Sequence, residues 1–314
     1  MERFRKILLF VNDPSADQET LDRAVALARN SGADLTLLGV VPKIPGELQQ
    51  WVTATRLSRI QKATGQARVE EINELAAPLR NAGLPIRTTV VTGTAFIQIV
   101  REVMRGGHDL LMVTAGGKGL MRNIRFDPTT LQLMRKSPCP VWAVKPGVSR
   151  GPLRILAAVD PLPSDRVRDS LNRRILELAT SLARMEKGEL HVIHTWQVRF
   201  EKRLRGRRKL SEGAAVQVND AARQLHRERL NLLLAGWGAE IPPHRVHLLK
   251  GEAGTVIPEF TAKRAMDIIV LGTVGRTGVA GFFIGNTAEM VLQQVDCSVL
   301  AVKPDGFESP VRLA

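Results

Sequence analysis

The segment Asp267–Pro304 reads DIIVLGTVGRTGVAGFFIGNTAEMVLQQVDCSVLAVKP, and it decides the fold. It predicts a buried strand at 267–271, a glycine-rich loop, a helix at 288–294 and a second buried strand at 298–304. Glycine lets the backbone adopt positive φ and approach a ligand closely, because it has no Cβ. The first turn of the following helix offers unpaired N–H groups to an anion. The order of these elements therefore predicts a phosphate site on an α/β sheet.

The spacing of the glycines excludes two common types of phosphate-binding loop. Two residues separate Gly272 from Gly275, nine separate Gly275 from Gly285, and Asn286 and Thr287 follow. This spacing matches neither the Walker loop nor the dinucleotide-binding glycine motif. The alternative is that the glycines only allow a tight crossover between two strands.

The same spacing resembles the nucleotide-binding signature of the universal stress protein superfamily. In that signature Ser or Thr follows the last glycine, and Arg or Lys commonly follows the second, as Arg276 does here. The residues of both glycine segments, 272–278 and 285–289, are similar to those of the tandem, E-type members of the family. This sequence departs from the family at Asn286, which replaces the hydroxyl residue and puts firm ATP binding in doubt.

The resemblance implies a doubly wound, five-stranded parallel sheet with strand order 3-2-1-4-5, of the adenine-nucleotide alpha-hydrolase-like type. Ligands of open α/β sheets bind at the switch point, which then lies between the first and fourth strands. The resemblance and this geometry together give the expected nucleotide-binding residues: Val159, Asp160, Leu271, Gly272, Thr273, Val274, Gly275, Arg276, Gly285, Asn286 and Thr287.

Two of these residues, Asp160 and Arg276, could have a role other than nucleotide binding. Asp160 follows a predicted strand and can accept hydrogen bonds from a nucleoside, or it can cap the next helix. Arg276 presents a fork of N–H donors that suits phosphate oxygens, or it is a surface arginine in a loop.

The chain is a duplication. The segment Ser137–Pro146 matches Val295–Pro304 at an offset of 158 residues, and the same offset pairs Gly93 with Gly251. The predicted domains are residues 1–148 and 152–314. Strands are expected at 6–11, 35–41, 86–91, 109–113, 141–144, 154–159, 190–196, 246–249, 267–271 and 298–304. Helices are expected at 18–30, within 47–81, and at 95–105, 168–186, 211–235, 255–264 and 288–294. We expect the two copies to form an intramolecular pseudo-dimer that meets along the last strand of each; a homodimer of the whole chain stays open.

The first copy departs from the signature where phosphate would bind. Thr114 replaces the first glycine, Gly117 keeps the second, and Asp127-Pro128 replaces the last glycine and its neighbour. The carboxylate of Asp127 would occupy the position at the helix N-terminus where an anion would otherwise bind (the anion seat), and it would repel phosphate. Lys118, Arg122 and Arg125 offset part of its charge. The first copy is therefore predicted to be a degenerate partner that binds no nucleotide.

Composition places the chain in a broad class. Its 314 residues, 44% of them hydrophobic and 24% charged, suit two globular domains of ordinary size. No apolar run approaches the ~20 residues that span a bilayer, and no signal peptide is expected at the N-terminus. Cys139 and Cys297 form no disulfide framework and are expected in the core. We expect a cytoplasmic protein that is not embedded in a membrane.

The net charge of +14 is spread over both halves of the chain. One basic cluster lies in residues 199–209, namely Arg199, Lys202, Arg203, Arg205, Arg207, Arg208 and Lys209. It is either a solvated surface or a contact for an anionic partner. Without interleaved aromatic residues or a recognition-helix motif, nucleic acid is not the expected partner.

The sequence shows no recognisable set of catalytic residues. The histidines have no metal-ligand spacing, and His191 and His194 are expected on opposite faces of one strand. Three functions remain. The first is a stress-response or regulatory protein that binds ATP or another adenine nucleotide in the second copy only, with no metal beyond nucleotide-associated Mg²⁺. The second is a slow ATPase or phosphotransferase. The third is a binding module for an apolar or anionic ligand or a protein partner, with a vestigial nucleotide loop.

The third function draws attention to the segment after Pro45. Its apolar residues are expected either in the core or along an apolar cavity; they are Trp51, Val52, Leu57 and Ile60.

Overall fold

A computed structural model describes residues 4–116, 126–147, 152–162, 165–198, 212–273 and 285–313. In the first copy the strands are β1 (Lys6–Phe10), β2 (Asp34–Val41), β3 (Ile86–Thr92), β4 (Leu110–Thr114) and β5 (Val141–Val144). In the second copy they are β6 (Arg154–Ala158), β7 (Glu189–Trp196), β8 (Val246–Lys250), β9 (Ile268–Gly272) and β10 (Ser298–Val302). These positions confirm the predicted strands to within two residues at nearly every end.

The helices follow the predicted alternation. The first copy has α1 (Gln18–Ser31), the 3-10 helix η1 (Gly46–Gln50), α2 (Ala54–Asn81), α3 (Ala95–Gly106) and α4 (Pro128–Lys136). The second copy has α5 (Arg166–Met185), α7 (Glu212–Leu234), the 3-10 helix η3 (Pro243–Arg245), α8 (Ala253–Lys263) and α9 (Asn286–Gln294). Helices α5 and α9 begin two residues before their predicted starts, directly after Asp165 and Gly285 as N-caps.

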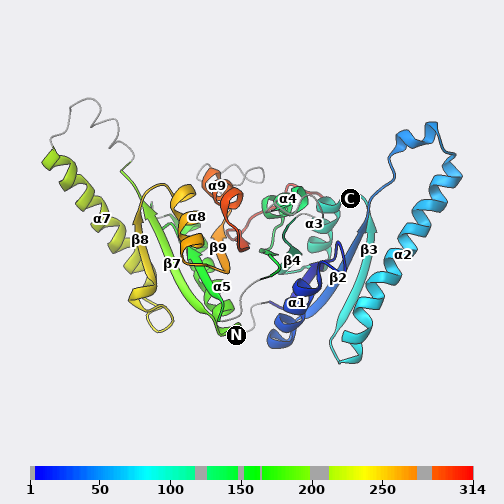
Figure 1. Cartoon of the computed structure of the whole chain (residues 1–314), viewed down its shortest axis with the longest axis horizontal. Helices are drawn as coiled ribbons and strands as arrows, with labels where there is room; N and C mark the ends of the chain where they lie inside the picture. Colours follow the sequence, from blue (N-terminus) through cyan, green and yellow to red (C-terminus); the bar gives the residue numbers. More distant parts are fainter. Residues whose placement is uncertain are drawn as a thin grey trace.

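All ten strands belong to one sheet, with the order β3-β2-β1-β4-β5-β10-β9-β6-β7-β8. Each half has the expected order 3-2-1-4-5, with parallel pairing inside the half. The halves join at β5 and β10, which pair antiparallel with Leu300 opposite Trp142. The order is the same from either edge, so the copies form the predicted pseudo-twofold pair within one chain (Figure 1).

Helices cover both faces of this sheet. Helices α1, α2, α5 and α7 contribute to one hydrophobic core, and α3, α4, α8 and α9 contribute to the other. Both cores contain residues of both copies, so the apolar layers continue across the junction. The long helices α2 and α7 lie at the two outer flanks (Figure 1). The C-terminal segment crosses to the first copy, where the Arg101 Nε donates to the Arg312 carbonyl over 3.0 Å.

The observed burial confirms the prediction that the two cysteines lie in the core, and it contradicts the prediction that the apolar residues after Pro45 do. Cys139 and Cys297 are buried, and burial raises the pKa of both thiols to about 12. The apolar residues after Pro45 do not pack in the core as a group, because Trp51 is 84% exposed and Ile60 is 46% exposed. Helix α2 begins at Ala54 and buries only its distal part, at Ile72 and Ala76. The core interpretation of the segment after Pro45 was therefore wrong.

Candidate functional site

The switch point of the second copy lies where β6 and β9 end side by side. Ala158 at the end of β6 pairs with Leu271 near the end of β9. The chain leaves both strands at the same edge of the sheet, so Asp160 and Thr273 emerge close together. This is the edge at which open α/β sheets bind ligands.

Helix α9 begins at this edge with Gly285 as its N-cap residue. The Gly285 N–H donates to the Thr273 carbonyl over 3.1 Å, which ties the helix start to the end of β9. Glycine has no side chain to cap the helix, and Asn286 and Thr287 in the first turn are exposed. Within the part of the chain that the structure describes, no side chain caps the start of α9, so its first-turn N–H groups and the positive end of the helix dipole can hold an anion.

In the first copy, the corresponding helix N-terminus, at the start of α4, is capped by a carboxylate. Asp127 is the N-cap of α4, and its Oδ1 accepts from the N–H groups of Thr129 at 2.8 Å and Thr130 at 3.1 Å. Its other oxygen accepts from the Thr130 hydroxyl. The carboxylate occupies the place that an anion would take, as the sequence predicted.

Asp160 is half-buried beside the switch point. Its backbone N–H donates to the Asn172 Oδ1 over 2.9 Å, and its carbonyl accepts from the same side-chain amide over 2.9 Å. Burial raises the pKa of the carboxyl, whereas His194, Arg168 and a hydrogen bond from the Leu162 backbone oppose that rise. The helix-cap alternative is wrong, because Asp165 caps α5 by accepting from the Arg168 N–H over 2.9 Å.

Several expected site residues have no side chain or a buried one, so they can contact a ligand only through their backbone atoms. A Cβ on Gly272 would come within 2.6 Å of the end of the Leu171 side chain of α5, so the packing of this helix also favours a glycine here. Thr273 is fully buried, and its hydroxyl faces the Val302 carbonyl at 3.5 Å. Val159 and Leu271 belong to the two cores. Val274, Gly275 and Arg276 lie outside the described residues, as do Gly117 and the basic clusters at 118–125 and 199–209.

Two histidines lie next to Asp160 and were missed by sequence reasoning as members of this site. His194 of β7 is buried; its Nδ1 lies 3.1 Å from the Val159 carbonyl, and its Nε2 lies 2.7 Å from the His226 Nδ1 of α7. Burial lowers the pKa of His194 to about 4, although the nearby Asp160 opposes this shift. His191 lies on the other face and contacts His247 at 3.1 Å, as strand alternation predicted. Among the described residues, no three His, Cys, Asp or Glu side chains gather closely enough to hold a metal ion.

Comparison with known proteins decides the family. The universal stress protein family model matches residues 3–145 and again residues 153–303. The chain belongs to the universal stress protein family.

Full-length relatives share the tandem arrangement of this universal stress protein. Universal stress protein E of Escherichia coli K12 is 31% identical over 317 residues, covering 100% of this chain and 98% of the relative. Universal stress protein E of Photorhabdus laumondii is 28% identical over 317 residues, covering 100% of this chain and 99% of the relative. The chain is therefore similar to the E-type, two-domain members.

Solved structures agree with the fold. A functionally unknown protein from Pseudomonas aeruginosa PAO1 has a TM-score of 0.76 and 25% identity, covering 98% of this chain and 95% of that chain. A universal stress protein from Archaeoglobus fulgidus has a TM-score of 0.63 and 17% identity, covering 95% of this chain and 98% of that chain. Within the described part of this universal stress protein, no helix has the length and apolar character needed to cross a bilayer.

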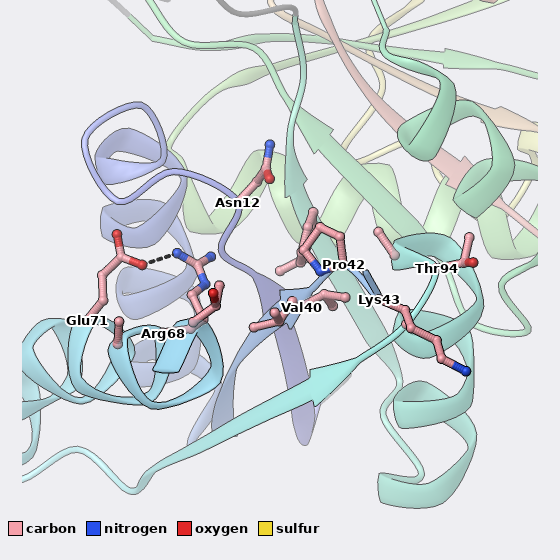
Figure 2. Close-up of a pocket in the computed structure, with 13 residues that line it drawn as sticks. Asn12, Val40, Pro42, Lys43, Arg68, Glu71 and Thr94 are labelled. Carbon is pink, nitrogen blue, oxygen red and sulfur yellow. Dashed lines mark hydrogen bonds and ion pairs between the residues drawn. The ribbon is translucent and has the colours of Figure 1, made fainter. Parts of the chain in front are cut away.

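The first universal stress protein copy contains an open cavity of about 720 Å³ (Figure 2). The cavity lies at the carboxyl ends of β1 and β2, between α2 and the start of α3. Its apolar lining residues are Phe10, Val40, Val41, Pro42, Ala67 and Ala95, and its polar ones are Asn12, Lys43, Thr64, Arg68, Glu71 and Thr94. None of Trp51, Val52, Leu57 and Ile60 lines this cavity.

The two universal stress protein copies differ at matched positions beside this cavity. Gly39 of β2 corresponds to His194 of β7 by strand register, and Arg68 corresponds to His226 at the repeat offset of 158. Arg68 donates to the Val11 carbonyl in the first copy, and the matched Val159 carbonyl faces His194 in the second. A Cβ on Gly39 would approach the Arg68 Nε to 3.0 Å, so the arginine occupies the space that an imidazole fills in the second copy.

Proposed function

We propose that this tandem universal stress protein is a cytoplasmic regulatory protein of the stress response that binds one adenine nucleotide, in its second copy. We place the domains at residues 1–148 and 152–314. The start of α9 beside Asp160 supports this proposal: a helix N-terminus that no described side chain caps and a half-buried carboxylate lie at the switch point of the second half-sheet. The first copy has Asp127 at the corresponding anion seat.

In this proposal each group has a separate role. The first-turn N–H groups of α9 and the side chains of Asn286 and Thr287 hold phosphate oxygens, and Arg276 adds charge from the glycine loop. Asp160 accepts a hydrogen bond from the nucleoside. Gly272 and Gly275 let the loop approach the ligand, and Val159, Leu271, Thr273 and Val274 shape the site through their backbone.

Isothermal titration calorimetry with ATP and with AMP, each with and without Mg²⁺, tests the proposal. We expect one site per chain. Gly285→Asp should abolish binding, because it gives α9 the capping carboxylate that α4 tolerates at Asp127. Asp127→Asn is the matched control and should leave binding unchanged. Two equivalent sites per chain, or no nucleotide binding at all, would contradict the proposal.

A further inference from the structure

The first copy has a protruding segment between β2 and α2. We call residues 43–62 the arm; it comprises the connection after β2, the 3-10 helix η1 and the first turns of α2. Figure 1 shows this segment projecting past the ends of the strands at the outer flank of the molecule. The Gln61 side-chain amide accepts from the Ile44 N–H over 3.0 Å and donates to the Pro42 carbonyl over 3.2 Å. These two bonds tie the two sides of the arm together, so it is a folded element.

The arm exposes large apolar side chains. Trp51 is the most exposed large apolar residue in the described part of the chain, and Leu48 and Ile60 of the same arm are exposed as well. The Trp51 N–H donates to the Leu48 carbonyl over 3.0 Å, so η1 holds these two residues close together. Single apolar residues are ordinary on a protein surface, but three large ones on one protruding arm favour a contact surface.

The same arm is basic. Three of its cations recur at every third residue of α2, which places them along one side of that helix. The one carboxylate in the arm belongs to Glu47, so the net charge of the arm is +3. The exposed cations of the arm are Lys43, Arg56, Arg59 and Lys62. Apolar and aromatic side chains beside Lys and Arg are typical of segments that lie in the headgroup region of anionic membranes.

A lipid surface matches this arrangement better than a protein groove does. Tryptophan is enriched at the boundary between headgroups and acyl chains, and Lys and Arg are attracted to anionic headgroups. A protein partner would need acidic groups placed one by one opposite the cations, whereas an anionic bilayer supplies negative charge over its whole plane. Because the arm projects from the body of the molecule, its tip is accessible to such a flat surface (Figure 1).

We propose that the arm of the first copy binds to the surface of membranes that contain anionic lipids. Leu48 and Trp51 enter the headgroup region, and Arg56, Arg59 and Lys62 pair with anionic headgroups. The contact uses no residue of the nucleotide site, so it is independent of nucleotide binding. It is reversible, because one short apolar tip and a few cations give much weaker membrane binding than a spanning helix does.

Vesicles with and without anionic lipid test the proposal. The probes are vesicles of phosphatidylcholine mixed with phosphatidylglycerol, and vesicles of phosphatidylcholine alone. We expect the full chain to sediment with the anionic vesicles only, and its tryptophan emission to shift to shorter wavelength. The shift reports on Trp51, because the other three tryptophans are buried or half-buried. Trp51→Ser should remove the shift and weaken binding roughly tenfold, because a large apolar side chain then no longer leaves water.

Matched variants separate the arm from the overall charge of +14. Arg56→Ser combined with Arg59→Ser should weaken binding to the anionic vesicles roughly tenfold. Arg223→Ser combined with Arg227→Ser removes the same charge at exposed positions of α7 and should change binding much less. Leu232→Ser is the apolar control on α7, where Leu232 is 68% exposed, and should bind as the unchanged chain does.

Any of three results would overturn the proposal. Equal losses in the two arginine pairs would mean that net charge attracts the vesicles, and not the arm. Unchanged emission and affinity in Trp51→Ser would mean that the tip does not enter the lipid. Concentration-dependent assembly of the chain that disappears in Trp51→Ser would mean that the tip contacts a second copy of the protein. Gly285→Asp should bind the vesicles normally, so a failure of nucleotide binding is distinguishable from a failure of this proposal.

Discussion

Lys303 is a buried cation at the junction of the two copies, and replacing it with methionine should stabilise the protein at neutral pH. The residue follows β10 and is 2% exposed. Its Nζ donates to the Arg135 carbonyl of α4 over 3.1 Å and lies 4.6 Å from the centre of the Phe307 ring. Burial lowers the pKa of Lys303 from 10.5 to about 7. The charged ammonium is therefore disfavoured in the folded state.

The sign of the pH dependence follows from that shift. Between about pH 7 and pH 10.5 the unfolded chain binds a proton at Lys303 that the folded chain has released, so stability rises with pH in this window. A shift of this size costs roughly 4 kcal/mol at pH 7, and about 2 kcal/mol of that cost disappears by pH 9. Methionine avoids the cost but loses the bonds to Arg135 and Phe307, worth about 1 kcal/mol each. Lys303→Met should therefore gain about 2 kcal/mol at pH 7 and almost nothing at pH 9.

Urea denaturation followed by circular dichroism at pH 7 and pH 9 measures both values. The matched control is Lys145→Met, because Lys145 stands at the same place in the first copy but is 31% exposed and paired with Asp296. That exposed pair is worth less than about 1 kcal/mol, so the control should change stability little at either pH. An equal gain for Lys303→Met at both pH values, or a loss at pH 7, would refute the reasoning.

Three further predictions concern the capping carboxylate, the histidine pair and turnover. Asp127→Ala should lower the free energy of unfolding by about 1 kcal/mol, as loss of an N-cap does, and a urea titration that finds no change would contradict the cap. Because burial lowers the pKa of His194 to about 4 from 6.5, the unfolded chain binds more protons in that window and stability falls on acidification. His194→Gln should remove about 2 kcal/mol of the loss between pH 7 and pH 5, and an unchanged pH profile in urea titrations would rule this out. ATP hydrolysis by the purified protein should not exceed roughly a few turnovers per hour, far below the ~1–10³ s⁻¹ of typical enzymes. A steady-state rate near one per second that disappears in Arg276→Ala would instead favour the phosphotransferase function.

Much of the fold was readable from the sequence because its signals are local. Runs of Ile, Leu and Val predict strands buried on both faces, and glycines mark where those strands end. The repeated segments before Pro146 and Pro304 predicted both the duplication and the pairing of β5 with β10. The different capping of α4 and α9 was also predictable, because an N-cap lies within a few residues of the N–H groups that it satisfies.

Long-range side-chain packing was not readable in the same way. The sequence does not show that Leu171 packs on Gly272, which gives that glycine a structural reason besides ligand approach. It also led us to expect burial of the segment after Pro45, because apolar composition alone does not say which side of α2 meets the sheet. Trp51, which lies between η1 and α2, is 84% exposed, and α2 itself is fully buried only in its distal part, at Ile72 and Ala76.

By itself, then, the sequence determined the two half-sheets, their junction and the difference between the N-cap residues Asp127 of α4 and Gly285 of α9. Only the tertiary structure decided what fills the space above the second strand of each half. Arg68 reaches the Val11 carbonyl over Gly39 and leaves a cavity beside it, whereas His194 and His226 occupy the matched space in the second copy. Arg68 and Val11 are 57 positions apart in the chain, and His194 and His226 are 32 positions apart. The physical reason is that such contacts depend on the three-dimensional packing of a helix against a distant strand, which no local pattern of residues specifies.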